Sequence, residues 1–257
     1  MTLIEHASTA LDQLFARAGV DDSHGTAHAL AVLCHVDTAI AKSNLFVGAP
    51  WSTAIRLAAL LHDADDRKYF RNGSNNAERI VRDLRVSDTV LRLVLRMIEL
   101  VSFSANGNGV PADAVENPML LWPRWADRIE ALGEIGIQRC YVHNGSNPLD
   151  LPGITPTPET ALAVFAHATP ERLTSYRTTG GSHSMMDHFY DKLLHLGNVD
   201  PQIIQNPYLT QALSYGLQPI VKTCLVYSYG GTDALKIHIR SIIDGETQPT
   251  ESPSSLA

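Results

Sequence analysis

The segment LAALLHDADDRKYF, residues 57–70, places His62 and Asp63 at the end of a strongly apolar run. A helix of that composition is expected to be buried, and burying an unpaired carboxylate beside an imidazole is costly. Two arrangements remove the cost: a hydrogen-bonded pair in the core, or a divalent cation shared by both side chains. Imidazole and carboxylate together suit Mn, Fe, Co, Ni or Zn better than the all-oxygen preference of Mg or Ca.

Two other segments carry side chains of the same types. HGTAHALAV puts His28 on the polar side of an apolar helix, and RWADRIEALG puts Asp127 in a helix that is apolar on one side. Together the three segments would supply two imidazoles and two carboxylates to one metal ion, as facing helices do in bundles. The four candidate metal ligands are His28, His62, Asp63 and Asp127.

The elements that must position these ligands show helical periodicity. The expected helices cover residues 24–42, 50–63, 87–101, 122–140 and 157–168. Ser87 is the expected N-cap of the third, and Thr157 with Pro158 is the expected start of the fifth. Segments 104–118 and 144–157, rich in Gly, Pro and Asn, are expected to be loops. With no alternation of strands and helices, the sequence predicts an all-α bundle, one domain over residues 1–245 and a disordered tail over 246–257.

Composition narrows the function. The chain has 257 residues and a net charge of −7, from 20 basic and 27 acidic residues, which argues against nonspecific nucleic-acid binding. A small anionic substrate stays compatible, because a metal can reverse the sign of one pocket. The cysteines (Cys34, Cys140 and Cys224) form no C-x-x-C pair, which favours a reducing compartment. Without a secretory signal or an 18-residue apolar run, the protein is expected to be cytoplasmic, with no membrane partner.

In order and spacing, these segments resemble the HD-domain metal-dependent phosphohydrolase superfamily, most closely its YedJ/YpgQ-like branch of nucleotide hydrolases. The matching segments are SHGTAHALAV, AALLHDADDRKYF, VSFSANG, ADRIEALGEIGIQR and HFYDKLL, which run from about residue 23 to 196. The resemblance implies an HD-type helical bundle with the metal site between core helices. It matches His28 to the first metal histidine, His62 and Asp63 to the signature pair, and Asp127 to the final ligand.

The resemblance also implies two catalytic residues. Asp66 and Lys68 match the branch's HD-x-x-D-x-K extension. Asp66 lies four residues beyond His62, so on a continuing helix the two would share a face. We expect Asp66 to orient or deprotonate the attacking water, and Lys68 to stabilise the anion that develops on phosphate.

Further residues are candidates for substrate binding. His24 lies one helical turn before His28 and would bind phosphate or position water. Arg128 follows the last ligand and is a candidate partner for an anion, with a salt bridge to a neighbouring acid as the alternative. His188 and Lys192 match the HFYDKLL segment, which is also an amphipathic helix. Lys68 belongs to this binding group as well.

No histidine lies between His62 and His143, the interval from which dinuclear HD enzymes take extra ligands. The sequence therefore predicts one divalent transition metal per chain, with Mn preferred and Co, Ni, Fe, Zn or Mg as alternatives. The expected function is hydrolysis of a nucleotide or related small phosphate compound by metal-activated water, including pyrophosphohydrolysis of a nucleoside triphosphate. An HD-type di-iron oxygenase and a non-enzymatic nucleotide-sensing HD protein are the alternatives. The oligomeric state is left open.

Overall fold

The computed structural model describes residues 2–21, 24–70 and 74–245. Over these ranges the chain is built from helices without a strand, which confirms the all-α prediction. None of the described helices is long and apolar enough to cross a membrane. The expected disordered tail, residues 246–257, lies outside the described residues.

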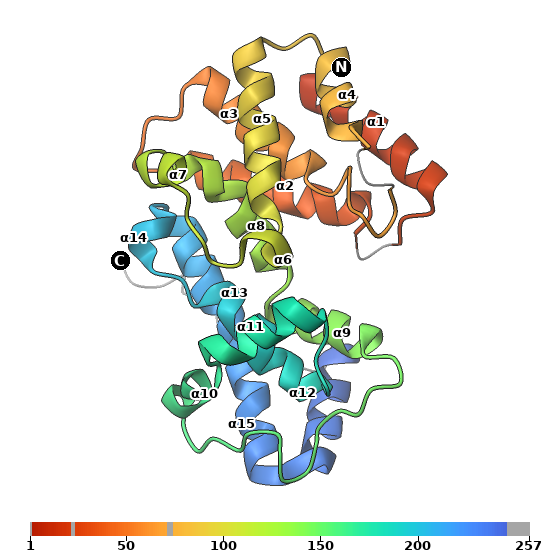
Figure 1. Cartoon of the computed structure of the whole chain (residues 1–257), viewed down its shortest axis with the longest axis vertical. Helices are drawn as coiled ribbons and strands as arrows, with labels where there is room; N and C mark the ends of the chain where they lie inside the picture. Colours follow the sequence, from red (N-terminus) through yellow and green to blue (C-terminus); the bar gives the residue numbers. More distant parts are fainter. Residues whose placement is uncertain (1, 22–23, 71–73, 246–257) are drawn as a thin grey trace. The chain divides into compact units, whose positions relative to one another are not determined.

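The helices group into two compact units (Figure 1). The first unit comprises residues 1–132 and 195–217, and the second comprises residues 133–194 and 218–257. The prediction of one domain over residues 1–245 stays a prediction. The elements of the first unit are α1 (Leu3–Ala18), α2 (Thr26–Ala41), α3 (Ala49–Leu61), α4 (Asn76–Asp83), α5 (Asp88–Val101), α6 (Phe103–Asn106), α7 (Ala112–Glu116), η1 (Pro118–Leu121), α8 (Trp122–Glu130) and α14 (Pro201–Ile204).

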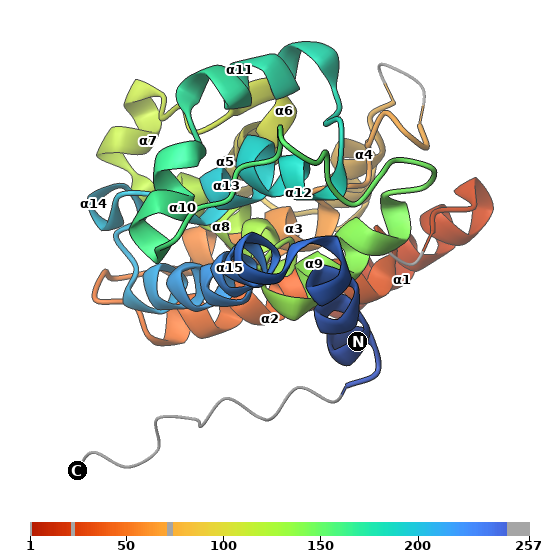
Figure 2. The same cartoon turned by 90° about the horizontal axis from the view of Figure 1, so that it is seen from below.

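The second unit contains the remaining helices. They are α9 (Gly133–His143), α10 (Ala161–His167), α11 (Pro170–Thr179), α12 (Met185–His188) and the π-helical segment η2 (Phe189–Leu193). Two helices cross the division, α13 (Leu194–Gly197) and α15 (Pro207–Ile243). Within the second unit α15 turns back on itself at Gly231, whose φ of 65° is left-handed, and Thr223 Oγ1 lies 3.0 Å from His238 Nε2 across the turn (Figure 2).

Helix α3 is the centre of the first unit. Apolar residues cover almost every side of this helix, and Ala54, Ile55 and residues 57–61 are fully buried. Helices α1, α2, α5 and α8 all pack on α3. Helix α2 buries Ala29, Val32 and Val36. The ligand-bearing helices are therefore held by the main apolar core of this unit.

The helix expected over residues 50–63 ends earlier than the sequence predicts. Helix α3 stops at Leu61, and His62 to Tyr69 follow as turns, in which Asp66 N–H donates to Asp63 O at 3.0 Å. Asp65 holds these turns in place, because its carboxylate accepts from the backbone N–H groups of Asn76 and Ala77 at 2.8 and 3.1 Å. The expectation that Asp66 continues the helix of His62 is thus wrong.

The sequence predicts some of the other helix ends correctly and others incorrectly. Ser87 caps α5 as predicted, accepting from Val90 N–H. The fifth helix begins later than expected, at Ala161, with Thr160 rather than Thr157 as its cap. The expected loop 104–118 contains α7 and most of α6, whereas 144–157 is free of helix. The helix expected over 122–140 is divided into α8 and α9, because Gly133 adopts a left-handed φ of 67°.

Two buried guanidinium groups connect α8 to the segment that follows α5. Arg124 donates to Leu100 O and Gly109 O at 2.6 and 2.8 Å, and Arg128 donates to Gly107 O and to Asn108 Oδ1 at 2.5 and 2.8 Å. Burial lowers the pKa of Arg124 to about 10 and that of Arg128 to about 9. The two arginines thus donate to oxygen atoms at the end of α5 and in the segment 107–109. Burial makes each positive charge less favourable.

We expect Arg124→Met to lower the free energy of unfolding by about 2–4 kcal/mol, because it removes the donors to the carbonyl oxygens of Leu100, which is buried, and Gly109, which is partly buried. Arg92→Met on the exposed face of α5 is the matched control and should change it by less than about 0.5 kcal/mol. Urea unfolding followed by circular dichroism measures both. Equal stability of Arg124→Met and the wild type would show that relief of the buried charge offsets the lost hydrogen bonds.

Candidate metal centre

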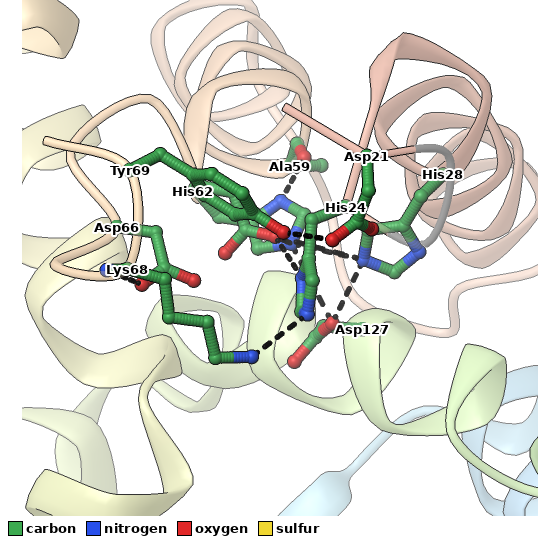
Figure 3. A network of polar contacts seen from close by, with 10 residues as sticks. Asp21, His24, His28, Ala59, His62, Asp66, Lys68, Tyr69 and Asp127 are labelled. Atoms are coloured by element: carbon green, nitrogen blue, oxygen red, sulfur yellow. Dashed lines mark hydrogen bonds and ion pairs between the residues drawn. The ribbon is translucent and has the colours of Figure 1, made fainter. Parts of the chain in front are cut away.

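The four predicted ligands meet at one point of the first unit, and Figure 3 labels His28, His62 and Asp127 among them. His28 comes from the first turn of α2, His62 and Asp63 from the end of α3, and Asp127 from α8. His28 Nε2 lies 3.3 Å from His62 Nε2 and 3.2 Å from Asp127 Oδ1. Asp63 Oδ2 lies 3.4 Å from His62 Nε2 and 4.0 Å from His28 Nε2. We call these four residues the ligand cluster.

The hydrogen bonds of the imidazoles direct lone pairs into the cluster. His62 Nδ1 lies 2.8 Å from the backbone oxygen of Ala59, which can only accept, so Nδ1 carries a proton and Nε2 faces the cluster. Nδ1 of His28 is buried without a hydrogen-bond partner among the described residues, so the polar contacts of that ring are at Nε2. Two unprotonated nitrogens 3.3 Å apart repel each other unless a cation or a proton lies between them.

The distances fit a transition-metal ion. Nitrogen and oxygen ligands bind such an ion at about 2.0–2.2 Å, which places neighbouring donor atoms about 3.0–3.6 Å apart. Four separations between donor atoms, from 3.2 to 3.5 Å, are in this range, and the His28–Asp63 separation of 4.0 Å is wider. The set of two imidazoles and two carboxylates suits Mn, Fe, Co, Ni or Zn.

The electrostatics of the cluster favour positive charge. Burial opposes an imidazolium at His62, yet the carboxylates of Asp63 and Asp127 outweigh burial and raise its pKa to about 10. Burial likewise opposes an ionised Asp127, but hydrogen bonds from His28 and His62 hold the pKa of Asp127 well below its ordinary value. The same field would stabilise a divalent cation at the centre of the cluster.

Three more predicted residues lie beside the cluster. His24 Nδ1 is 3.1 Å from Asp63 Oδ2, and Lys68 Nζ is 3.0 Å from His24 Nε2. An ammonium group can only donate, so Nε2 of His24 accepts and its Nδ1–H donates to Asp63. One carboxylate oxygen of Asp66 lies within 4.8 Å of the donor atoms of His24 and Asp63, and Asp66 Oδ1 accepts from Lys68 N–H at 2.9 Å. Asp66 therefore reaches the site from a turn rather than from a helix.

The other predicted substrate contacts have different surroundings. The Arg128 guanidinium is buried, bonded to the 107–108 loop and stacked 4.7 Å from the Trp125 ring, which gives it a structural role instead of an exposed anion site. His188 and Lys192 belong to the second unit. Burial, with a smaller contribution from Lys192, lowers the pKa of His188 to about 3, so its ring is neutral near pH 7.

Sequence reasoning missed polar residues that support the site. Asp65 caps α4 and fixes the turn that carries Asp63 and Asp66. Tyr69 donates a short hydrogen bond to Asp21, and its ring lies 6.1 Å from that of His24. The signal available for Asp65 was its place in the run DADD ahead of a helix whose own N-cap residue, Asn75, makes no side-chain cap.

We expect Asp63→Ala to abolish most of the stabilisation by Mn²⁺, because that gain follows the affinity of the folded state for the ion. At 100 times the dissociation constant the wild type gains about 2.7 kcal/mol, and a hundredfold weaker site would lose most of it. Melting temperatures are measured with chelator and with excess Mn²⁺. Asp37→Ala, which breaks the Arg56 ion pair elsewhere on α2, is the control. An undiminished Mn²⁺ increment in Asp63→Ala would contradict a metal role for Asp63.

Comparisons with known proteins show which of them this chain resembles. No family model matches the chain. A crystal structure of a structural genomics target from Lactobacillus plantarum matches with a TM-score of 0.57, over 94% of this chain and 99% of that one, at 18% identity. That likeness shows a shared fold and no more. A viral protein is 34% identical over 206 residues, which span 73% of this chain and 81% of the relative. The chain therefore belongs to the same family as uncharacterized protein L803 of Acanthamoeba polyphaga mimivirus.

Proposed function

We propose that this protein is a metal-dependent phosphohydrolase of the HD type, acting on a nucleotide or a related small phosphate compound. The observation that carries the proposal is the ligand cluster, in which His28 Nε2 lies 3.3 Å from His62 Nε2 and 3.2 Å from the carboxylate of Asp127. Such a cluster beside a lysine ammonium combines a cation site with an adjacent group that binds phosphate. The order of the sequence segments, which resembles the HD superfamily, supports the same assignment.

The residues present fit a divalent ion, which His28, His62, Asp63 and Asp127 would hold. When bound, such an ion polarises a phosphoryl oxygen and acidifies a water molecule. The side chains of the ligand cluster are buried to different extents: that of His62 is 2% exposed and that of Asp127 is 30% exposed. The more exposed Asp127 side of the cluster is where we expect substrate to approach.

Asp66 is the proposed general base. Its backbone turn is fixed by the bond to Asp63 O, and its side chain is oriented by Lys68 N–H. Oriented in this way, a carboxylate oxygen lies within 4.8 Å of a donor atom of Asp63, close enough to share a water molecule with the cluster. A positioned carboxylate can take a proton from the attacking water as its oxygen bonds to phosphorus and the bond from phosphorus to the leaving oxygen breaks.

Lys68 is the proposed phosphate-binding group. Although its residue is exposed, its ammonium is anchored at 3.0 Å from His24 Nε2, and His24 in turn donates to Asp63. This chain of hydrogen bonds fixes a positive charge beside the cluster. A fixed charge stabilises the developing anion without first paying the cost of ordering a mobile side chain.

The hydrogen bonding of His24 favours one metal over two. His24, Asp63 and Asp66 form a second group whose donor atoms lie within 4.8 Å of one another. A second ion there would need His24 Nδ1 as a ligand, so Nε2 would carry the proton. That proton would point at the Lys68 ammonium, a donor facing a donor at 3.0 Å. This geometry disfavours the di-iron oxygenase alternative.

Incubation with a panel of nucleoside mono-, di- and triphosphates in the presence of Mn²⁺ tests the function. Chromatography of the products should show release of phosphate or pyrophosphate that stops on chelation. The identity of the released product distinguishes cleavage of a phosphate ester from cleavage of a phosphoanhydride bond. Turnover of none of these compounds would contradict the proposal.

Elemental analysis of the purified protein should find about one divalent transition-metal ion per chain, because one complete set of ligands is present. His62→Ala should lose the ion, since His62 Nε2 is central to the cluster. Two tightly held ions per chain would overturn the mononuclear assignment.

Asp66→Asn should retain the metal and reduce kcat by about 10²–10⁴-fold, the usual contribution of a positioned proton acceptor. Asp83→Asn, which removes a carboxylate from the exposed end of α4, is the control and should leave kcat unchanged. Metal content and circular dichroism are measured on both variants. A fully active Asp66→Asn protein would show that another group activates the water.

A further inference from the structure

A second histidine–carboxylate pair joins α2 to α8. His35 Nε2 lies 2.8 Å from Glu130 Oε1, and His35 Nδ1 lies 2.6 Å from the hydroxyl of Tyr208 in the first turn of α15. The His35 and Glu130 side chains are only 20% and 16% exposed. All three residues belong to the first unit. We call Tyr208, His35 and Glu130 the His35 chain.

Glu130 and Tyr208 contact the two ring nitrogens of His35. The Glu130 carboxylate accepts, so Nε2 of His35 carries a proton. His35 Nδ1 lies at hydrogen-bond distance from the hydroxyl of Tyr208, whose pKa burial raises. Both ring nitrogens are therefore used, and the ring cannot rotate without breaking both bonds.

The His35 chain repeats the geometry of the ligand cluster along the same two helices. His35 follows His28 by seven residues, two turns of α2 and about 10 Å along its axis, on the same face. Glu130 follows Asp127 by three residues, one turn of α8 on the same face. Helices α2 and α8 are thus linked twice, by the His28–Asp127 pair at 3.2 Å and by the His35–Glu130 pair at 2.8 Å.

The place of Glu130 suggests that its bond matters for α8. Glu130 is the last residue of α8, where an acidic side chain interacts unfavourably with the helix dipole. Beyond it Gly133 adopts a φ of 67° and the helix does not continue. The C-terminal end of this nine-residue helix is therefore held by side-chain contacts, of which the bond to His35 is a charge-assisted one.

We propose that the His35 chain is a positioning device for the metal centre, which fixes α8 against α2 and keeps Asp127 at ligand distance from His28. One contact between two helices leaves them able to slide or rotate about it, whereas two contacts separated along the axis do not. Tyr208, His35 and Glu130 act through the two helices and are positioning residues. The inference rests on the proposed function, in which Asp127 is a metal ligand.

The chain offers a matched control at the same location. Asn206, just before α15, donates to Ala39 O at 2.9 Å and accepts from Leu209 N–H at 3.1 Å. Asn206→Ala removes a contact of α15 with α2 but leaves the α2–α8 pairs intact. It should lower stability without changing metal affinity.

The first experiment measures Mn²⁺ affinity of the full chain by calorimetric titration, at a temperature where circular dichroism shows every variant folded. We expect His35→Phe and Glu130→Ala to weaken Mn²⁺ binding by about 10–100-fold, the usual effect of losing a residue that orients a metal ligand. Glu130→Gln keeps an acceptor oxygen and should retain most of the affinity. If His35→Phe lowers the melting temperature but binds Mn²⁺ like the wild type, the chain is merely structural and the inference fails.

The second experiment uses protein kept with chelator, and so does not depend on metal binding. If the His35 chain positions Asp127, the effects of His35→Phe and Asp127→Asn on the melting temperature should not be additive. The melting temperature of the double variant should fall by less than the sum of the two single decreases. Additive losses would overturn the inference. Failure of the wild type to bind any divalent ion would instead contradict the proposed function, while this cycle still decides the positioning role.

Discussion

The crowding of donor atoms in the ligand cluster is the constraint on which the first unit depends. Like charges and facing lone pairs repel, and more strongly in a buried setting than in water. His62 Nε2 is within 3.5 Å of His28 Nε2, Asp63 Oδ2 and Asp127 Oδ1, so packing must hold these groups together. The fully buried α3 supplies that packing, and the bond from His62 Nδ1 to Ala59 O sets the direction of the ring. A cation turns the same crowding into stabilisation.

The features that the sequence predicts correctly depend on interactions between residues close together in the chain. Apolar periodicity marks α2, α3 and α5 because each buries a stripe or more of its surface, and Ser87 caps α5 through its own neighbouring backbone. The four proposed metal ligands could be selected because imidazoles and carboxylates at the ends of apolar helices are unusual. The end of α3 could not be found in this way, since the turn after Leu61 is fixed by Asp65 bonding to α4 eleven residues later.

Burial decides the role of a charged side chain, and burial of a polar group is not visible in the sequence. Arg128 was a candidate partner for an anion, with a salt bridge as the alternative, and His188 was a candidate substrate contact because of the resemblance. Arg128 is 2% exposed, and two of its nitrogens donate to the loop at Gly107 and Asn108. His188 is neutral near pH 7 because desolvation lowers its pKa to about 3. Lys68 keeps its predicted position beside the cluster, because the turn that carries it is close to Asp63 in sequence.

The polar residues of the short helix α8 contribute both to the candidate site and to the packing of the fold. Successive residues of an α-helix point about 100° apart, so neighbours contact different partners. Asp127 faces His28, Arg128 faces the carbonyl of Gly107, and Glu130 faces His35. Asp127 and Glu130 on one face and Arg128 on another restrict rotation of α8, and the pairs with His28 and His35 also restrict its translation along α2. The position of Asp127 beside His28 therefore depends on contacts that its neighbours make, which is why the proposed metal centre should respond to changes at residues that do not bind the ion.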